Sequence, residues 1–324
     1  MKRIITPILF MGLLLSGCSD DECEPQINDE LVPVRFSPLV ADIQQANSRA
    51  VKTTWAQNDK IAIFSDIAVK KDGNTSTASI TYTRGAVEGD WSSPSEDERW
   101  YFADAIRQHN FYAYYPIGIA TSYTAVEIPD ISGQDGTKTL TALKEENDFM
   151  RGTAVATKGN IAASLQMFRV FSIVNFKIKL KLNAFANNTA SLTEVKLIST
   201  SSLPLVNPTA SDKATVDLSS GQITCANGLT SVTLRPASGL TLTTTEISIP
   251  IKIYPQHSTI QVQFTINGKT STVQTLSTTN FVSGRIYNYA VEVNAGLSQF
   301  GIGDPIIFDW MNIDGTPISP VVPS

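Results

Sequence analysis

The sequence is poor in cysteine, histidine and basic charge. Three of its 324 residues are cysteine, two are histidine, and the formal net charge is −5. Zinc sites need clustered Cys and His ligands, and no Cys pair stands at ligand spacing, so no metal site is expected. The Lys and Arg residues form no block. This absence argues against nucleic acid as a partner and against a polybasic membrane patch.

Long apolar runs are also missing, except for one near the N-terminus. Residues 4–15 follow two basic residues, and about a dozen apolar residues are too few for a membrane-spanning helix. Residues 1–17 are therefore predicted to be an export signal peptide. Ser16–Gly17 before Cys18 resembles the lipobox of bacterial lipoproteins. The alternative is an ordinary cleaved signal followed by an incidental cysteine.

The lipobox resemblance implies that Cys18 becomes the N-terminus and carries lipid, such as palmitate, on its sulfur and amine. Each buried CH2 of an acyl chain contributes about 0.8 kcal/mol to membrane binding, so several chains would hold the protein stably at the outer membrane. Residues 18–30 are predicted to be an acidic tether, since they begin Cys-Ser-Asp-Asp-Glu. The same acidic run resembles the signal that sends lipoproteins of Bacteroidota to the cell surface. A disulfide between Cys23 and Cys225 stays open, because no spacing demands it.

Apolar and polar residues alternate with a period of two over most of the chain. The stretch VNFKIKLKL at 174–182 predicts a long antiparallel strand with Lys and Asn on a wet face. In EISIPIKIYP, Pro250 falls on the outward face and suggests an edge strand or a bulge. Asn267–Gly268 predicts a tight hairpin turn, because both residues accept positive φ easily. The best candidate for a short helix is residues 139–148.

These patterns predict an all-β fold with two tandem antiparallel β-sandwich domains of transthyretin-like or Greek-key type. The break is placed near Lys158–Asn160. The N-terminal sandwich would then cover residues 31–160, and the C-terminal sandwich with its tail would cover 161–324.

The segment HNFYAYYP at 109–116 is rich in aromatic side chains. Clustered tyrosines can form a platform for sugars, since each ring offers an apolar face and a hydroxyl. The simpler interpretation is a core strand with aromatic residues on both faces. The acidic run Glu96–Glu98 likewise has two interpretations. Glycosidases use two carboxylates that flank a sugar, but a charged surface loop explains this run more simply.

Several short motifs together resemble the fimbrillin (Mfa-like) lipoproteins. In chain order these motifs are Arg49–Ala50 with Trp55, Asn58–Asp59 and KIAIF at 60–64, then FYAYYP at 111–116, NDFMRG at 147–152, SGRIYNYAVEV at 283–293 and Asp309–Trp310. Each motif is weak by itself, but their order behind a lipobox is fairly specific. The resemblance implies a two-domain pilin precursor of type V pili, cut after an Arg by a surface protease.

In that family the cut removes the N-terminal strand, and a strand from a neighbouring subunit fills the vacated place. Here the exchanged strand would be residues 32–40, with Val32, Val34 and Phe36 as its buried side chains. The candidate cleavage site is Arg49–Ala50, and Arg35 is the poorer alternative because it lies inside the strand. Removing an edge strand exposes unpaired N–H and C=O groups, which an incoming strand can pair again.

The C-terminal tail departs from the expected pattern of a donor strand. After Trp310 the sequence reads MNIDGTPISPVVPS, and its prolines remove backbone donors. A proline-rich strand can still pair along one side, so the tail is a weak donor candidate.

The sequence predicts no enzyme and no cofactor. Neither His109 nor His257 stands beside a nucleophile motif, and no GxSxG, Walker loop or dinucleotide fingerprint occurs. The expected function is a structural or adhesive fimbrial subunit with other subunits as partners, in a homo- or hetero-polymer, and with a host or glycan receptor as a further candidate. The alternative is a surface lipoprotein that binds glycans through Trp91, Trp100 or Tyr114. A secreted hydrolase is a third hypothesis, which would depend on Glu96–Glu98.

Overall fold

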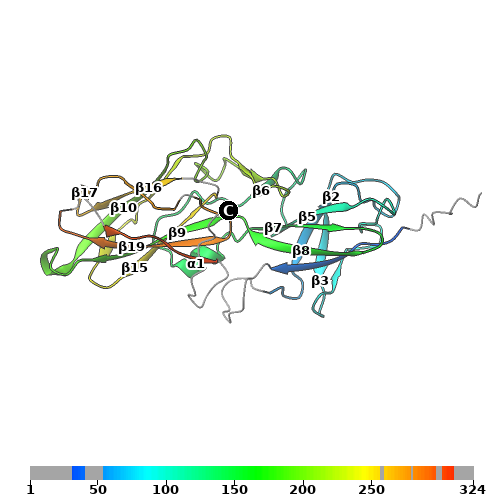
Figure 1. Ribbon diagram of the computed structural model, residues 1–324, viewed down its shortest axis with the longest axis horizontal. Coiled ribbons are helices and arrows are strands. Elements are labelled where there is room, and N and C mark those ends of the chain that lie inside the picture. The colour runs from blue at the N-terminus through cyan, green and yellow to red at the C-terminus, as the bar shows by residue number, and fades with distance from the viewer. Residues whose placement is uncertain (1–30, 41–53, 256–258, 279, 297–300, 310–324) are drawn as a thin grey trace, which may run out of the picture. The chain divides into compact units, whose positions relative to one another are not determined.

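The computed structural model of the chain describes residues 31–40, 54–255, 259–278, 280–296 and 301–309 (Figure 1). The signal peptide, the tether and the tail after Asp309 lie outside these residues, and so does the predicted cleavage site. Within the described part, almost all regular structure is β-strand, which confirms the all-β prediction. None of its helices is long and apolar enough to cross a membrane.

The first half of the chain builds a seven-stranded sheet in the order β1-β8-β7-β5-β2-β3-β4. Its strands are β1 (Arg35–Val40), β2 (Lys60–Ser65), β3 (Ile80–Arg84), β4 (Trp91–Ser92), β5 (His109–Tyr115), β7 (Met150–Ala156) and β8 (Ala162–Arg169). All neighbouring pairs are antiparallel except β1 and β8, which are parallel. The predicted all-antiparallel arrangement is therefore wrong at this edge, because β1 enters beside β8 in the same direction.

The aromatic segment at 109–116 forms β5, the central strand of this sheet. Phe111, Ala113 and Tyr114 are buried, and Tyr112 and Tyr115 are half-buried. The structure therefore favours the core-strand interpretation over an exposed tyrosine platform.

The second half builds a five-stranded sheet in the order β15-β9-β19-β20, with β21 also paired to β19, and a six-stranded sheet around β10 and β16. The five-stranded sheet contains β9 (Ser172–Leu180), β15 (Ile247–Ile253), β19 (Arg285–Val293), β20 (Gly301–Ile302) and β21 (Ile306–Asp309). The six-stranded sheet contains β10 (Ala190–Ser199), β13 (Ser231–Leu234), β14 (Leu240–Leu242), β16 (Ile260–Ile266), β17 (Lys269–Thr270) and β18 (Gln274–Thr275). A 3-10 helix, η1, covers Ala186–Asn188.

Strand β9 keeps the predicted alternation only in part. Val174, Phe176 and Ile178 are buried as expected, but Asn175 on the other face is also fully buried. Its amide donates to Asn288 Oδ1 at 2.6 Å and accepts from Ser248 Oγ at 2.7 Å. The prediction of a wet face is wrong at this position, because neighbouring strands supply polar partners that replace water. Strand β9 also pairs parallel to β19, so this sheet is mixed.

Three local predictions are confirmed. The turn between β16 and β17 contains Asn267 and Gly268 with φ of 48° and 71°, as a type I′ turn requires. Helix α1 (Leu140–Glu145) begins after Thr139, whose side chain accepts a hydrogen bond from the Ala142 N–H. Strand β15, which contains Pro250, is an edge strand.

The chain leaves the first sheet later than the sequence indicates. The predicted break at Lys158–Asn160 is the turn of the β7–β8 hairpin, where Thr157 and Asn160 bridge. The passage to the second set of sheets comes after Arg169, at the end of β8. The halves also share a small sheet, in which β6 (Val126–Ile128) pairs with β11 (Ala214–Val216), and β11 pairs with β12 (Ile223–Thr224). Residues 31–324 form one compact unit, and the division into two domains stays a prediction.

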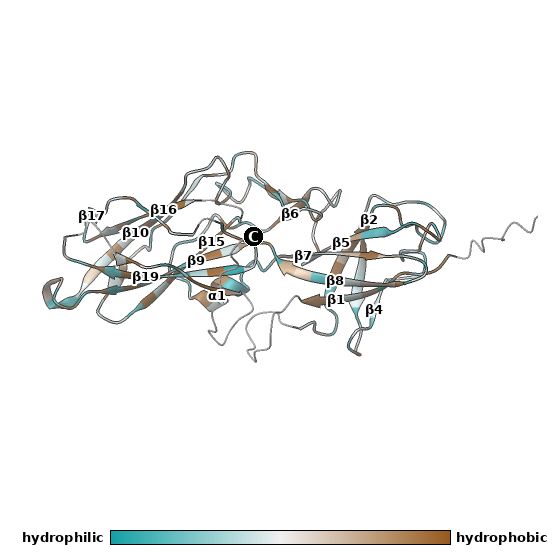
Figure 2. Ribbon diagram, viewed as in Figure 1, coloured by the Kyte–Doolittle hydropathy of each residue, from teal (hydrophilic) through white to brown (hydrophobic). Residues whose placement is uncertain are grey.

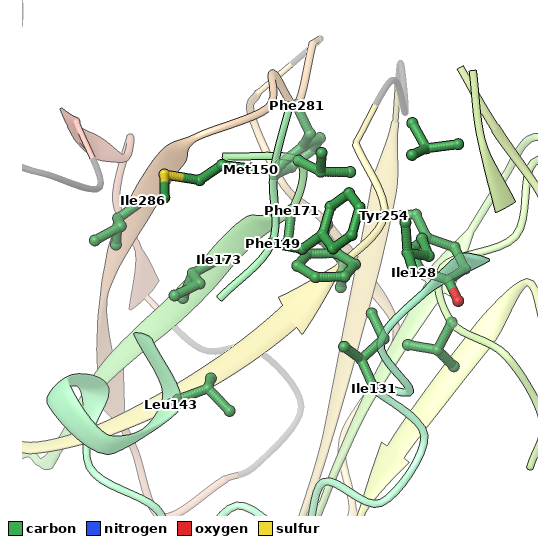
Figure 3. Close-up of a cluster of buried hydrophobic side chains, with 14 of the residues drawn as sticks. Ile128, Ile131, Leu143, Phe149, Met150, Phe171, Ile173, Tyr254, Phe281 and Ile286 are labelled. Atoms are coloured by element: carbon green, nitrogen blue, oxygen red, sulfur yellow. The ribbon is translucent and has the colours of Figure 1, made fainter. Parts of the chain in front are cut away.

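The core runs through both sets of sheets. In Figure 2 the strands carry both hydrophobic (brown) and hydrophilic (teal) segments, as expected for strands with one face in the core and the other nearer to solvent. Where the chain passes from β8 to β9, the rings of Phe171 and Tyr254 stack with centroids 6.2 Å apart. Figure 3 shows Phe149, Leu143 and Ile131 in the same cluster, so helix α1 and its flanking loops are packed onto this part of the core.

Candidate functional site

The predicted exchangeable segment pairs with two different parts of the first half. On one side, the Val34 N–H donates to the Trp100 carbonyl at 2.9 Å, and the Phe102 N–H donates to the Val32 carbonyl at 3.0 Å. On the other side, the Arg35 N–H donates to the Ile161 carbonyl at 2.9 Å, and β1 continues along β8. The segment therefore ties residues 100–102 to the large sheet.

Side chains of the segment alternate strictly between core and surface. Val34, Phe36 and Val40 are 4%, 3% and 9% exposed, whereas Leu39 is 55% exposed. Val32 at the start of the segment is half-buried. Fully burying one such apolar side chain contributes about 1.5–3 kcal/mol, so the buried side chains supply much of what holds the strand.

Phe36 is the largest buried side chain of the segment. Its ring meets Tyr82 edge-on with centroids 4.8 Å apart, and it meets Phe111 edge-on with centroids 5.0 Å apart. Such edge-to-face pairs add about 0.5–1.5 kcal/mol each beyond the burial of area. Phe36 is therefore the main anchor of β1.

The surroundings of Phe36 are fixed by hydrogen bonds that do not involve β1. The Trp100 indole N–H donates to the Ile63 carbonyl at 2.9 Å, and the Trp100 backbone N–H donates to the Tyr82 hydroxyl at 3.0 Å. Burial raises the pKa of Tyr82, so its hydroxyl stays protonated at neutral pH. We call β8, residues 100–102, Tyr82 and Phe111 together the first-strand site.

Backbone groups along β1 also alternate between two directions. The Arg35 N–H points to β8, whereas the Val34 N–H points away from it. By the same alternation, the backbone N–H groups of Ser37 and Leu39 point to β8, and the backbone nitrogen of Pro38 points away from it. Pro38 therefore lacks its N–H on the side of β1 away from β8, where no bond of the β1–β8 ladder is lost.

The remaining predicted site residues lie outside the described part of the chain. They are the lipidation candidate Cys18 and the processing candidates Arg49 and Ala50. Cys23 and His257 also lie there. Cys225 is described, and it is half-buried. Lipidation, processing and the Cys23–Cys225 disulfide stay predictions.

Two of the three residues offered for glycan binding are not accessible. Trp100 and Tyr114 are 0% and 1% exposed, because both belong to the core of the first half. Their assignment to a sugar platform is wrong. Trp91 is half-buried, and its ring packs edge-on against Trp55 with centroids 5.3 Å apart.

The acidic run Glu96–Glu98 is an exposed loop, as the simpler interpretation predicts. Lys71 Nζ lies 2.9 Å from Glu96 Oε2 and 3.7 Å from Asp97 Oδ1. The hydrogen bond from Lys71 lowers the pKa of Glu96, so this carboxyl is not a proton donor near neutral pH. Among the described residues, no group of three or more His, Cys, Asp or Glu side chains could hold a metal ion.

His109 has a structural role in the core. Its side chain is buried, its Nε2 accepts from the Ala103 N–H at 3.1 Å, and its Nδ1 lies 3.1 Å from the Arg107 carbonyl. Burial lowers its pKa, which favours the neutral ring that this pair of bonds needs.

Nothing in the alternating pattern of residues 247–253 indicated a polar site on β15. Lys252 is 1% exposed, and its Nζ donates to the Glu146 carbonyl beside a cavity of about 260 Å³ lined by Asp130, Gln134, Lys138 and others. Burial lowers the pKa of Lys252 to about 8. The alternating pattern placed this lysine on a wet face, and only the packing of the 130–147 segment could reveal its burial.

Solved structures with the same overall fold come from species of Bacteroides. A fimbrial protein from Bacteroides vulgatus superposes with a TM-score of 0.52 at 12% identity, covering 86% of this chain and 99% of its own. Candidate cell adhesion proteins from Bacteroides uniformis and Bacteroides ovatus each give a TM-score of 0.51, at 18% and 16% identity. They cover 88% and 87% of this chain, and 100% and 99% of their own. At these identities the likeness shows the fold alone.

A search of curated proteins gave no match. The profile of the fimbrillin-like family matches residues 48–310, which is most of the chain and begins after β1. The chain therefore belongs to the fimbrillin-like family.

Proposed function

We propose that this protein is a structural or adhesive subunit of a cell-surface fimbria. It is exported as a lipoprotein on Cys18, held at the outer membrane by its lipid, and assembled with other fimbrial subunits by strand exchange. Family membership supports the fimbrial role, and the fimbrial protein from Bacteroides vulgatus shares the fold. The proposed role involves no catalytic step, no cofactor and no nucleic acid.

One observation carries the strand-exchange part of the proposal. The segment 32–40 is an edge strand whose buried side chains fit a site that is also held by bonds outside the segment, such as that from the Trp100 indole to the Ile63 carbonyl. Loss of the segment would expose the ladder groups of β8 and the apolar surroundings of Phe36. A strand with alternating apolar side chains from another subunit would cover both.

Cleavage at Arg49–Ala50 would start the exchange. The cut separates β1 from the rest of the chain, so that β1 is held by noncovalent contacts alone and can leave. Before the cut, the covalent connection keeps the strand at high effective concentration and any competitor at a disadvantage.

The test is assembly of the full chain in a Bacteroidota host, with N-terminal sequencing of the assembled material. We expect material that begins at Ala50 and forms SDS-resistant ladders, because dissociation requires stripping a whole strand. The variant Arg49→Lys should stay lipidated and unassembled, and Cys18→Ser should lose membrane attachment.

Arg35→Lys is the matched control, since this arginine is exposed on β1 and its change leaves the buried face intact. It should assemble like the unaltered protein. Assembled material that still carries Cys18 would contradict processing, and ladders formed by uncut protein would contradict strand exchange after cleavage.

A further inference from the structure

The cavity beside Lys252 has no part in the proposed strand exchange. Its volume is about 260 Å³, and its lining comes from the 129–138 loop, helix α1, residues 146–147 and strand β15. Sites for drug-sized ligands measure roughly 300–1,000 Å³, so this space has room for one small ligand. We call it the α1 cavity.

Part of the lining of the α1 cavity is apolar. Pro129, Ile131 and Leu143 contribute to it, and Ile131 and Leu143 are 4% and 3% exposed. Figure 3 shows Leu143 on helix α1 and Ile131 in the same buried cluster. These side chains are held by the core, so they offer a fixed apolar wall to a ligand.

The charged groups of the lining balance one another. Asp130 and Glu146 contribute two carboxylates, and Lys138 and Lys252 contribute two ammonium groups. Lys138 Nζ lies 2.5 Å from Glu146 Oε2, with both side chains partly exposed, and Lys252 Nζ donates to the Glu146 carbonyl. Because the charges cancel, the cavity favours neither an anion nor a cation, and a neutral polar ligand suits it best.

The Asp130 carboxylate is held in place from behind. Its Oδ1 accepts from Asn207 Nδ2 at 2.5 Å and from the Ser132 N–H at 2.8 Å. Asn207 is buried, and its own Oδ1 accepts from the Tyr254 hydroxyl at 3.1 Å. Burial acts to raise the pKa of Asp130, but hydrogen bonds from Ser132 and Asn207 outweigh it, so the pKa is lowered. The carboxylate is therefore ionised at neutral pH and has lone pairs left for a ligand hydroxyl.

Two further groups of the lining can bond a ligand. Asn147 Nδ2 donates to the Asp130 carbonyl at 2.8 Å, and among the described residues no hydrogen bond reaches Asn147 Oδ1. Lys138 Nζ carries three donors, and its ion pair with Glu146 leaves others for a ligand. The cavity thus offers acceptors and a donor around an apolar wall. Hydroxyl groups both donate and accept, so a ring of hydroxyls around an apolar C–H face matches this lining.

We propose that the α1 cavity binds one neutral pyranose unit of a glycan. Leu143 and Ile131 contact the C–H face of the sugar ring. Asp130 and Asn147 accept hydrogen bonds from its hydroxyls, and Lys138 donates one. This site gives the proposed adhesive role, on which the proposal rests, a ligand class and a place in the chain.

Binding is tested on the full-length protein with single sugars. The probes are the methyl glycosides of glucose, galactose, mannose, fucose, N-acetylglucosamine and N-acetylgalactosamine, with a methyl sialoside as the charged probe. Saturation-transfer difference NMR and isothermal titration calorimetry measure binding. We expect at least one neutral glycoside to bind, with the strongest saturation on the C–H protons of one ring face, and the sialoside to stay unbound. Binding of the sialoside alone, or of no probe, would overturn the proposal.

Filling the cavity tests its position. Gly133 lines the α1 cavity, and a Cβ added there would meet no atom within 4 Å. Gly133→Phe is therefore accepted by the backbone, takes up room in the cavity and should abolish glycoside binding. Gly118→Phe is the matched control, because a Cβ at Gly118 also meets no atom within 4 Å and this residue does not line the cavity. It should bind like the unaltered protein.

Removing one acceptor tests the polar contacts. Asn147 has a φ of 54°, which glycine adopts freely, so Asn147→Gly removes the side-chain amide without backbone strain. We expect glycoside binding to weaken about tenfold, because a ligand hydroxyl loses its partner. Asn187→Gly is the matched control, since Asn187 has the same φ of 54° and lies in η1, outside the lining. Binding that Gly133→Phe or Asn147→Gly leaves unchanged would overturn the assigned site.

Failure of this site and failure of the proposed assembly are distinguishable. Protein that forms SDS-resistant ladders after cleavage but binds no glycoside would overturn the sugar site and leave the fimbrial role standing. Protein that binds a glycoside in the α1 cavity but forms no ladders would support the site and contradict strand exchange.

Discussion

The two halves of the chain differ in how the backbone groups of their edge strands β1 and β15 are covered. The edge strand β1 of the first sheet is short and carries one large aromatic anchor, and within the described part of the chain its residues 36–40 pair with β8 alone. The edge strand β15 of the second sheet is covered. The Lys252 N–H donates to Gln134 Oε1 at 2.7 Å, and Gln134 Nε2 donates back to the Lys252 carbonyl at 2.7 Å. One side-chain amide thus takes the place of a neighbouring strand.

Proline completes the protection of β15. Pro250 lies two residues before Lys252, so its backbone nitrogen faces the same open side and offers no donor there. Gln134 is itself held by a bond from its Nε2 to the Ile131 carbonyl at 2.8 Å. In the proposed strand exchange, the β1 edge changes partners, whereas the β15 edge is protected against strand addition.

The largest expected effect comes from Phe36→Ala. Loss of a buried aromatic side chain costs about 3–5 kcal/mol, and here it should also weaken the hold on β1. Urea unfolding of the full chain should show an earlier first transition. The control Leu39→Ala should shift stability by less than about 0.5 kcal/mol, because this side chain is exposed. Equal effects of the two changes would contradict the role of Phe36 as anchor.

The next effect concerns the protected edge. Gln134→Ala removes the partners of the Lys252 backbone N–H and carbonyl, and leaving such groups unpaired costs about 1–3 kcal/mol. Thermal unfolding measures this loss. The double variant Gln134→Ala/Pro250→Ala should also begin to self-associate through β15, which analytical ultracentrifugation would detect. A monomeric double variant would show that another feature protects this edge.

Lys252 gives the second half a pH dependence that the first-strand site lacks. Its folded pKa of about 8 is below the unfolded value near 10.5, so between these values the folded state binds fewer protons. Stability should therefore rise by roughly 2 kcal/mol from pH 7.5 to 9.5. Lys252→Met should remove this rise, as measured by urea unfolding at several pH values. The exposed Lys179 is a control, because Lys179→Met should keep the rise.

The smallest effects come from the two edge prolines taken singly. Pro38→Ala and Pro250→Ala each increase the freedom of the unfolded chain, which lowers stability by about 0.4–1 kcal/mol. Hydrogen exchange should show the new amide of Pro38→Ala exchanging faster than the amides of Ser37 and Leu39, since it faces away from the β8 ladder. A protected amide at position 38 would mean that a further strand covers β1.

Local patterns were the easiest features to predict from the sequence. Asn267–Gly268 requires only positive φ, and α1 requires only a capping residue and a few helix formers, so both followed from neighbouring residues. The buried face of β1 followed from alternation alone.

Features that depend on partners far along the chain were not predictable. Asn175 and Lys252 follow the same polar pattern as exposed strand residues, yet both are buried beside groups from distant segments. For the same reason, Trp100 and Tyr114 were wrongly expected at the surface. The boundary between the two halves was also expected in what is the turn of the β7–β8 hairpin.

The sequence by itself determined the strands, the turns and the alternating faces, because these depend on steric preferences and on residues a few positions apart. Only the tertiary structure decided which strands are neighbours, that β1 runs parallel to β8, and which polar residues are buried. These properties depend on which distant backbone lies alongside, and the cost of an unpaired buried group selects among the arrangements.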